Sequence, residues 1–318
     1  MIAFLISAIR LGVTFLFGST GEIISEKSGH LNLGIPGVMC VGAAFGCVAE
    51  SYYTRSVGSP DALQPVLAVL IPVVATMIGG GLMGLLYSFL AVTLRANQNV
   101  TGLALTTFGV GLSNFMISRV SPFSYAQASR FFTASLPFGK SWGEAGRLLF
   151  SYGIMVYLAI VVALVASYVL NRTRTGLYLR AVGENPATAD AAGINVSAYR
   201  YGATCIGCAI SGLGGLSFIM DYLNGNWEYC IDSMGWLAVA LVIFTVWKPN
   251  VAVLGSVIFG GLYIASSYVT GISFAVKEIF KMLPYAVTIL VLIVTSMRNK
   301  RESQPPASLG LPYFREDR

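Results

Sequence analysis

The residues best suited to chemistry in this chain lie near its N-terminus. Glu22 and Glu26 are one helical turn apart, and His30 follows four residues further on. Paired carboxylates can exchange protons with a substrate, but no other group completes an active site, and one His with two acids is a weak set of metal ligands. We therefore predict no catalytic residues, no metal site and no cofactor in this chain. This polar turn is either solvated or in contact with a gate or a partner protein.

Two other patterns resemble known sites without their usual context. Gly79, Gly81 and Gly84 match the dinucleotide motif GxGxxG, but they lie in an apolar run with no acidic residue about 20 positions further on. Cys205 and Cys208 form a CxxC with no second pair and no neighbouring His. We interpret the glycines as points of close helix contact and the cysteines as small buried hydrophobic residues.

The charged residues are few and widely spaced. The chain has 318 residues, of which 20 are Lys or Arg and 14 are Asp or Glu, so charged residues make up 11%, against about 25% in soluble domains. The 33 residues between Asp61 and Arg95 carry no charge, and a membrane-spanning helix needs roughly 20 apolar residues. This composition excludes a soluble globular fold and indicates contact with membrane lipid. The basic residues form no stripe with aromatic side chains, so we expect no nucleic-acid partner.

The spacing of the charges leaves nine apolar segments. They predict an all-α polytopic membrane protein with about 8–10 transmembrane helices, some of them broken or re-entrant, at residues 2–18, 34–53, 65–94, 99–119, 148–170, 198–220, 235–247, 250–270 and 281–297. The segment 235–247 is short enough to be re-entrant, and 65–94 is long, with kink points at Pro72 and at 79–81. Similar sequences at 102–108 and 236–244 suggest an inverted repeat, although apolar composition by itself also produces such similarity.

The chain divides into a transmembrane region, 1–297, and a tail, 298–318. The tail carries five basic and three acidic residues, so the positive-inside rule places it in the cytoplasm. Four predicted crossings separate the tail from the loop 171–197, which puts this loop on the same side. The loop 119–147 has as many basic residues as 171–200, so the assignment rests on the number of crossings and not on loop charge.

The loop 171–197 contains a short helix with its own start and stop signals. Asn185 suits the N-cap, Pro186 suits the first helical position and Gly193 suits the residue just past the end. A helix of about two turns is marginal by itself in water, so we expect 186–192 to lie against another surface. The segment is either an ordinary ordered loop or a docking helix for a cytoplasmic partner.

The same loop carries a resemblance to a known family. Its sequence RAVGENP at 180–186, followed by AAGI at 191–194, resembles the coupling loop of ABC-transporter permeases in the branched-chain amino acid and ribose permease superfamily, and is most similar to the nucleoside permeases. The blocks GEIISEKSGHLNLGI at 21–35 and LGLPYFRE at 309–316 agree with this resemblance. Pro36 departs from the family pattern Gly-Ile-x-Gly-Met, in which an acidic or polar residue is expected at that position.

The resemblance implies a permease subunit of an ATP-driven importer in the plasma membrane, with nucleosides as cargo. Such a chain pairs with an identical or similar permease, receives cargo from an extracytoplasmic substrate-binding lipoprotein and docks an ABC ATPase through the helix at 186–192. No GxxxxGK[ST] phosphate loop occurs here, so ATP and Mg²⁺ are expected on the ATPase chain. The residues implied to couple to the ATPase are Arg180, Gly183, Glu184, Asn185, Pro186, Asp190 and Gly193. A sugar or a branched-chain amino acid is the alternative cargo, and a secondary transporter is the alternative mechanism.

Amide and hydroxyl side chains gather around the segment 99–119. Such groups are costly in a bilayer unless they face protein or water, and they suit the hydroxyls and ring nitrogens of a nucleoside. We expect them either to line the substrate pathway or to form hydrogen bonds between helices. The candidates are Asn32, Asn97, Gln98, Asn99, Thr101, Thr107 and Asn114. A second polar group, from Asp221 to Asp232, is expected either to receive the lipoprotein on the outer face or to form a solvated loop.

Overall fold

The computed structural model describes residues 2–135, 143–228, 231–269, 271, 273–298 and 304–314. Over these ranges the chain forms helices joined by turns and contains no strand, which confirms the predicted all-α fold. Seven of the described helices are long and apolar enough to cross a membrane. They are α1 (Ile2–Glu26), α2 (Ile35–Val57), α3 (Pro65–Ser88) with its π-helical extension η2 (Phe89–Thr93), α4 (Gln98–Ile117), α8 (Ile154–Arg172), α11 (Val196–Ser217) with its π-helical extension η4 (Phe218–Tyr222), and α13 (Pro249–Tyr268).

Two shorter helices complete the nine expected apolar segments. They are α12 (Ile231–Phe244) and α15 (Leu283–Arg298). α12 has 14 residues and rises about 21 Å, which is less than the ~30 Å hydrocarbon core of a bilayer, so it is the short segment that the sequence indicates at 235–247. The remaining helices are η1 (Pro60–Ala62), α5 (Pro122–Ala126), α6 (Ser129–Phe132), α7 (Gly143–Phe150), α9 (Arg174–Glu184), α10 (Pro186–Ala191) and α14 (Phe274–Lys281).

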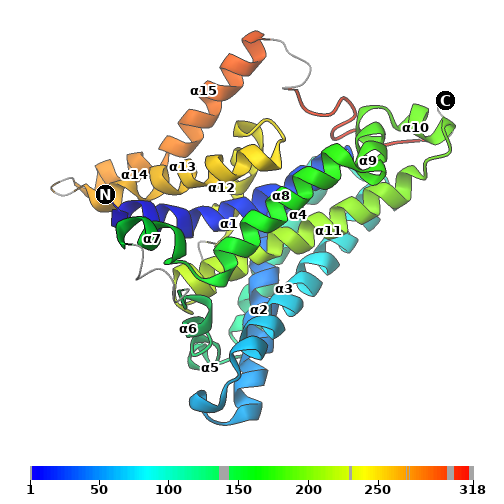
Figure 1. The fold of residues 1–318 in the computed structure, drawn as a ribbon. Coiled ribbons are helices and arrows are strands. Elements are labelled where there is room, and N and C mark those ends of the chain that lie inside the picture. The colour runs from blue at the N-terminus through cyan, green and yellow to red at the C-terminus, as the bar shows by residue number, and fades with distance from the viewer. Residues whose placement is uncertain are drawn as a thin grey trace.

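Helices α1 and α11 pack along each other at the centre of the bundle (Figure 1). Gly21 of α1 faces Gly207 of α11 so closely that a Cβ on Gly21 would lie 2.1 Å from the Gly207 carbonyl oxygen. A Cβ on Gly207 would lie 2.4 Å from the Gly21 carbonyl oxygen. Small residues allow this approach, and van der Waals contact then holds the two helices together in lipid, where the hydrophobic effect does not.

The neighbouring helices approach this central pair in the same way. α3 packs on α11 at Gly80 and Gly84, and a Cβ on Gly80 would lie 2.4 Å from the Cys208 carbonyl oxygen. α13 packs on α1 at Gly12 and Gly260. The prediction of close helix contacts is therefore confirmed at Gly79, Gly80 and Gly84, whereas a Cβ on Gly81 would meet nothing nearer than 3.9 Å.

The helix contacts follow a pattern that two related halves would produce. α1 packs on α11, α12 and α13, while α11 packs on α1, α2 and α3. Exchanging α1 with α11, α2 with α12 and α3 with α13 therefore reproduces the contacts of the two central helices, as an internal repeat does, although α2 packs far more extensively on α3 than α12 does on α13. The segment 236–244 lies in α12 and corresponds to α2 in this scheme, whereas the similar segment 102–108 lies in α4. The sequence similarity between those two segments consequently does not mark equivalent helices.

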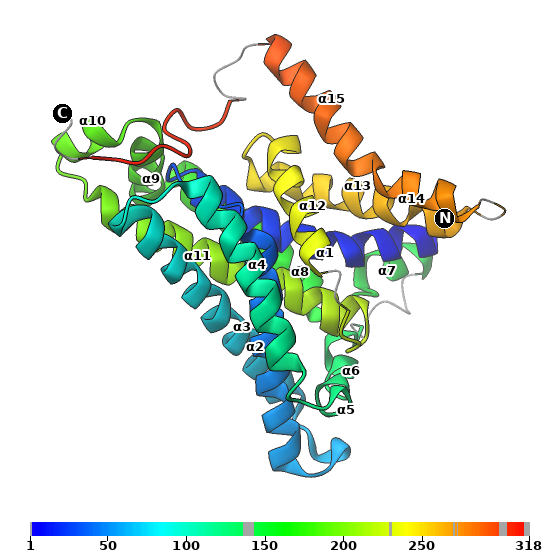
Figure 2. The same ribbon diagram turned by 180° about the vertical axis from the view of Figure 1, so that it is seen from behind.

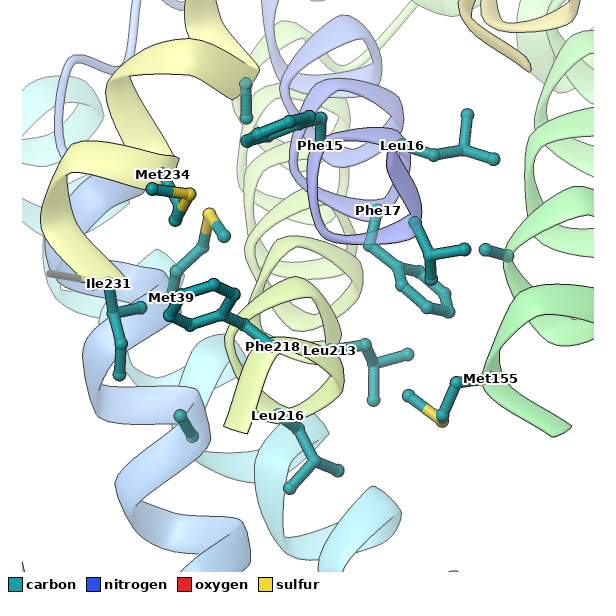
Figure 3. Packing of buried hydrophobic residues seen from close by; sticks show 14 of the residues in the cluster. Phe15, Leu16, Phe17, Met39, Met155, Leu213, Leu216, Phe218, Ile231 and Met234 are labelled. Carbon is teal, nitrogen blue, oxygen red and sulfur yellow. The ribbon is translucent and has the colours of Figure 1, made fainter. Parts of the chain in front are cut away.

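An apolar core fills the junction of α1, α2, α11 and α12. Phe15, Met39, Phe218 and Met234 are all buried there, and Phe17 is buried on the side of α1 that faces Met155 of α8 (Figure 3). The flexible methionine side chains fill gaps that the rigid rings leave. This packing fixes the relative positions of the four helices and thereby of the polar groups at their ends.

The outward faces of the peripheral helices are apolar. Leu82 and Leu85 of α3 and Val161 and Leu164 of α8 are exposed. Large apolar patches are unfavourable in water but match the hydrocarbon of a bilayer. Together with the seven long apolar helices, this surface identifies a polytopic membrane protein, with α15 extending away from the rest of the bundle (Figure 2).

Candidate coupling and translocation sites

A side-chain cap begins the short helix α10. Oδ1 of Asn185 accepts the backbone N–H of Thr188 at 3.0 Å, and Pro186 occupies the first turn. Gly193 follows the end of the helix with a φ of 82°, a left-handed conformation that favours glycine. The predicted helix and its start and stop signals are confirmed, with α10 covering Pro186–Ala191.

A small apolar cluster holds α10 in place. Ala189 packs with Val182 and Val196, and all three are buried. Gly183 lies against the turn that follows α1, because a Cβ there would lie 2.3 Å from the carbonyl oxygen of Lys27. Because the two backbones are in van der Waals contact, α9 cannot move toward the end of α1 without displacing it.

The described part of the C-terminal tail, 304–314, packs onto the same loop (Figure 1). Ser308 donates its backbone N–H to the carbonyl oxygen of Gly183 at 3.0 Å. The Tyr313 hydroxyl donates to Oδ2 of Asp190 at 2.8 Å. The tail is therefore in direct contact with the transmembrane region through α9 and α10.

The structure brings all seven predicted coupling residues into α9, α10 and the turn after α10. Three of them are exposed, namely Glu184, Asn185 and Gly193. Gly183 is buried and is a packing residue. The others are half-buried, namely Arg180, Pro186 and Asp190.

Two ionisable groups beside α9 lie outside the membrane-spanning helices. Burial lowers the pKa of Lys27, and the nearby negative charge of Glu184 opposes that shift. Burial, together with the positive charge of Arg200, lowers the pKa of His30 to about 3. His30 is therefore neutral at physiological pH, and its Nδ1 lies 2.8 Å from Oγ1 of Thr204.

The carboxyl groups near the N-terminus are buried, so the interpretation of this region as a solvated turn is wrong. Glu22 is 0% exposed and Glu26 is 3% exposed. Oε1 of Glu22 accepts the backbone N–H of Asn32 at 3.1 Å, and Oε2 of Glu26 accepts the indole N–H of Trp247. Asn32 lies in the turn after α1 and Trp247 lies just after α12, so the two carboxyl groups connect the end of α1 to both segments. In the described ranges, no three His, Cys, Asp or Glu side chains come close enough to hold a metal ion.

The predicted pathway residues divide into two groups, and the first is hydrogen-bonded inside the protein. Oε1 of Gln98 accepts the backbone N–H of Leu31 at 2.9 Å. Oδ1 of Asn32 accepts the backbone N–H of Gly34 at 2.9 Å. Both side chains are buried. Gln98 joins the turn after α1 to the start of α4, whereas the bond from Gly34 to Asn32 stays within that turn. Nδ2 of Asn32 donates to Sγ of Cys208 in α11 at 3.4 Å. The bonds of Gln98 and of Asn32 Nδ2 are those that the alternative interpretation expects.

The second group lies along α4. Asn97 caps this helix, and the hydroxyls of Thr101 and Thr107 donate to carbonyl oxygens one turn back. Asn99 and Thr107 are exposed, and Asn114 is half-buried two turns beyond Thr107. These last three residues form a polar stripe on the outward face of α4, which lipid by itself would not favour.

A buried ion pair lies at the far end of the central helices. Asp221 in η4 is 0% exposed, and its Oδ1 lies 3.3 Å from Nη2 of Arg10 in α1. Asp221 therefore belongs to the helix packing and not to a surface for a partner. Asn224, Asn226 and Glu228 follow in the turn beyond it, while Tyr229, Cys230 and the side chain of Asp232 lie outside the described residues.

A comparison with protein families identifies the chain. Residues 4–292 match the family described as the branched-chain amino acid transport system / permease component. The chain belongs to this family. The match covers all seven long apolar helices and both α9 and α10, so the whole transmembrane region is a permease.

Several ABC transporter permeases are similar to the chain over most of their length. This permease is 33% identical over 291 residues to a nucleoside ABC transporter permease of Lactococcus lactis subsp. cremoris, which covers 87% of each chain. It is 30% identical over 308 residues to a guanosine ABC transporter permease of Bacillus subtilis, which covers 94% of this chain and 92% of the relative. A putative glucose ABC transporter permease of Haloferax volcanii is 29% identical over 80% of this chain and 74% of its own. No solved structure matches this permease.

Two features of the site escape sequence reasoning. The contact of the tail with α9 joins Ser308 to Gly183, and the buried carboxyl of Glu26 meets Trp247, which is far away in the sequence. The blocks 21–35 and 309–316 stand out in the sequence, but their contact with each other and with α10 has no local signal.

Proposed function

We propose that this permease forms the translocation path of an ATP-driven importer of nucleosides. The observation that supports nucleosides as the cargo is the similarity to two permeases named for nucleosides and guanosine, at 30% identity or more over at least 87% of this chain. The chain binds no ATP in this proposal. ATP and Mg²⁺ bind to a separate ABC ATPase subunit.

The ATPase docks on the exposed side of α10. Glu184, the last residue of α9, and Asn185, the N-cap of α10, are exposed where the two helices meet. Ala189 holds the buried side of α10, and the Gly183–Lys27 contact holds α9. When ATP binding closes two ATPase subunits, the displacement of α10 passes to the end of α1 and to α11. The central helix pair then changes between outward-open and inward-open arrangements. This assignment places α10 and the tail in the cytoplasm.

A second permease, identical or similar, covers the polar stripe of α4. Asn99, Thr107 and Asn114 lie on an outward face of the single chain, and amides and hydroxyls favour protein or water over lipid. A path between two subunits provides both. The same groups supply the hydrogen-bond donors and acceptors that a nucleoside needs.

An extracytoplasmic lipoprotein delivers the cargo at the opposite end. The short helices α5 and α6 lie far from α10 along the bundle (Figure 2), and the turn at 223–228 adds polar side chains to that end. These elements form the receiving surface in this proposal.

Reconstitution with the co-produced ATPase and lipoprotein tests the proposal. Uptake of labelled guanosine into proteoliposomes should require ATP, and unlabelled nucleosides should compete while ribose and leucine do not. Glu184→Ala should reduce both uptake and ATP hydrolysis. Arg172→Ala, an exposed change at the end of α8, should leave both unchanged. Uptake without ATP, or a rate of ATP hydrolysis that Glu184→Ala does not change, would refute the proposed coupling.

A sugar is the second candidate cargo. The putative glucose permease of Haloferax volcanii is 29% identical over 80% of this chain, which is only slightly below the nucleoside permeases. Competition of guanosine uptake by glucose, with none by adenosine or uridine, would favour the sugar.

A further inference from the structure

A cavity of about 420 Å³ lies beside α10, away from the polar stripe of α4. Its walls come from η2, the link between η2 and α4, the turn between α10 and α11, and the tail. The polar and charged residues that line it are Arg95, Asp190, Asn195, Ser197, Arg200 and Tyr313. The cavity therefore joins three parts of the chain that are far apart in the sequence, namely 91–95, 190–200 and the tail.

Arg200 gives this cavity a buried positive charge. Its side chain belongs to a residue that is 2% exposed, and Nη1 donates to the carbonyl oxygen of Leu311 at 3.4 Å. Nε and Nη2 find no hydrogen-bond partner in the described part of the chain. Buried donors without acceptors are costly, and a guanidinium offers five N–H groups in a fork that matches a carboxylate or phosphate. Arg200 lines the cavity, so an anionic ligand there would lie beside this guanidinium and offset its charge.

Arg95 adds a second guanidinium to the lining of the cavity. It lies 4.7 Å from the centre of the Phe314 ring, so the tail holds it in place by a cation–π contact. Its φ of 55° is left-handed, which a residue with a Cβ adopts only where its surroundings impose it. The chain thus directs Arg95 toward the tail at the rim of the cavity.

The start of α11 contributes to the same attraction. Asn195, Val196 and Ser197 line the cavity, and α11 is 22 residues long. Oδ1 of Asn195 already accepts the N–H of Ala198 at 3.0 Å, but the N–H groups before Ala198 lack partners within the helix, and the helix dipole favours an anion there. The N-terminus of a long helix and two arginines therefore converge on one space.

One carboxylate opposes these positive groups. Asp190 lines the cavity, and its Oδ2 accepts the Tyr313 hydroxyl at 2.8 Å. The lining therefore has two guanidinium groups and one carboxylate, which leaves a net positive charge. The carboxylate also restricts the ligand to one compact anionic group near the two arginines.

We propose that this cavity binds a phosphate group, carried either by a soluble phosphomonoester or by a lipid headgroup. Phosphate fits better than a carboxylate because its three terminal oxygens can accept from Arg95, Arg200 and the start of α11 at once. The ligand would tie α11 and the tail to α10. This site goes beyond the proposed transport function, since its ligand is not the cargo and its binding does not require the ATPase.

Binding to the purified full chain in detergent tests the proposal. The probes are inorganic phosphate and adenosine monophosphate by calorimetry, and phosphatidylglycerol against phosphatidylcholine by native mass spectrometry. Arg95→Gln and Arg200→Gln should each weaken phosphate binding about tenfold or more, because each removes charge-assisted hydrogen bonds. Arg119→Gln is the matched control, since Arg119 is exposed at the other end of α4 and lies 4.8 Å from the Phe115 ring, and it should not change binding.

Each outcome decides the matter. Binding of the soluble probes that depends on both arginines supports a phosphomonoester, and arginine-dependent binding of phosphatidylglycerol alone supports the lipid headgroup. Binding that all three variants retain, or no binding of any probe, overturns the proposal. If no probe binds but Arg95→Gln weakens association with the ATPase subunit, the cavity receives a side chain of that protein and the phosphate assignment is wrong. Arg95 is exposed and makes no structural hydrogen bond in the described residues, so its variant remains informative even if Arg200→Gln fails to fold.

Discussion

Replacing Gly21 by alanine should force the two central helices apart. A Cβ at this position would lie 2.1 Å from the Gly207 carbonyl oxygen and 2.3 Å from Oγ of Ser211. Carbon and oxygen atoms in contact across helices are about 3.3 Å apart or more, so α1 and α11 must separate by roughly 1 Å. Overpacking of this kind costs roughly 1–3 kcal/mol.

The alanine also raises intrinsic helix propensity, by up to ~1 kcal/mol, and this gain must be separated from the clash. Gly202→Ala is the matched control because it lies in α11 and a Cβ there meets nothing within 4 Å. Both variants gain the same propensity, so the difference between them reports the helix contact. At about 2–4 °C per kcal/mol, Gly21→Ala should unfold roughly 2–12 °C below Gly202→Ala.

Thermal unfolding of the purified variants in one detergent measures this difference. Gly207→Ala should behave like Gly21→Ala, and the double variant should cost less than the sum, because the first alanine already separates the helices. If Gly21→Ala unfolds at or above the temperature of Gly202→Ala, the close approach of α1 and α11 is wrong. A simple additive double variant would mean that the two glycines act at separate contacts.

Three further predictions concern single side chains. Asn185→Ala removes the acceptor for the Thr188 N–H and should destabilise α10 by about 1 kcal/mol, which should lower uptake and ATP hydrolysis in the reconstituted importer. Asp221→Asn leaves Arg10 without its charged partner and should lower the free energy of unfolding by roughly 3 kcal/mol, measured by thermal unfolding. Burial holds the pKa of His30 at about 3 in the folded chain against about 6.5 when unfolded, so stability is complete above pH 6.5 and is lost as the pH falls below it. At pH 5.5 the loss is about 1.4 kcal/mol, and His30→Gln should remove this part of the pH dependence of the unfolding temperature.

Matched controls separate these effects from general damage. Asn185→Asp keeps a capping oxygen and should retain activity; equal losses in both Asn185 variants would argue against the cap. Asp61→Asn disrupts an exposed pair with Arg130 at 3.9 Å and should be nearly neutral, so a similar effect at Asp61 and Asp221 would contradict the importance of burial. An unchanged slope of stability against pH in His30→Gln would show that other groups cause it.

The site is predictable from the sequence where local chemistry decides. Asn185, Pro186 and Gly193 define α10 because an N-cap, a proline at the start and a left-handed glycine at the end depend only on neighbouring backbone. The placement of Thr107 and Asn114 two turns apart on α4 likewise follows from helical spacing. Their roles in coupling and transport stay predictions.

By itself, the sequence determines that the chain lies in a membrane, where its long helices run and which family it belongs to. Long charge-free runs predict membrane-spanning helices, because a helix satisfies its own backbone hydrogen bonds in lipid. Only the tertiary structure decides what the polar residues do. Glu22 and Glu26 look like a solvated pair in the sequence, yet both are buried and accept hydrogen bonds from Asn32 and Trp247. Hydrogen-bond partners that are distant in the sequence leave no local pattern, so burial and pairing emerge only when the helices pack.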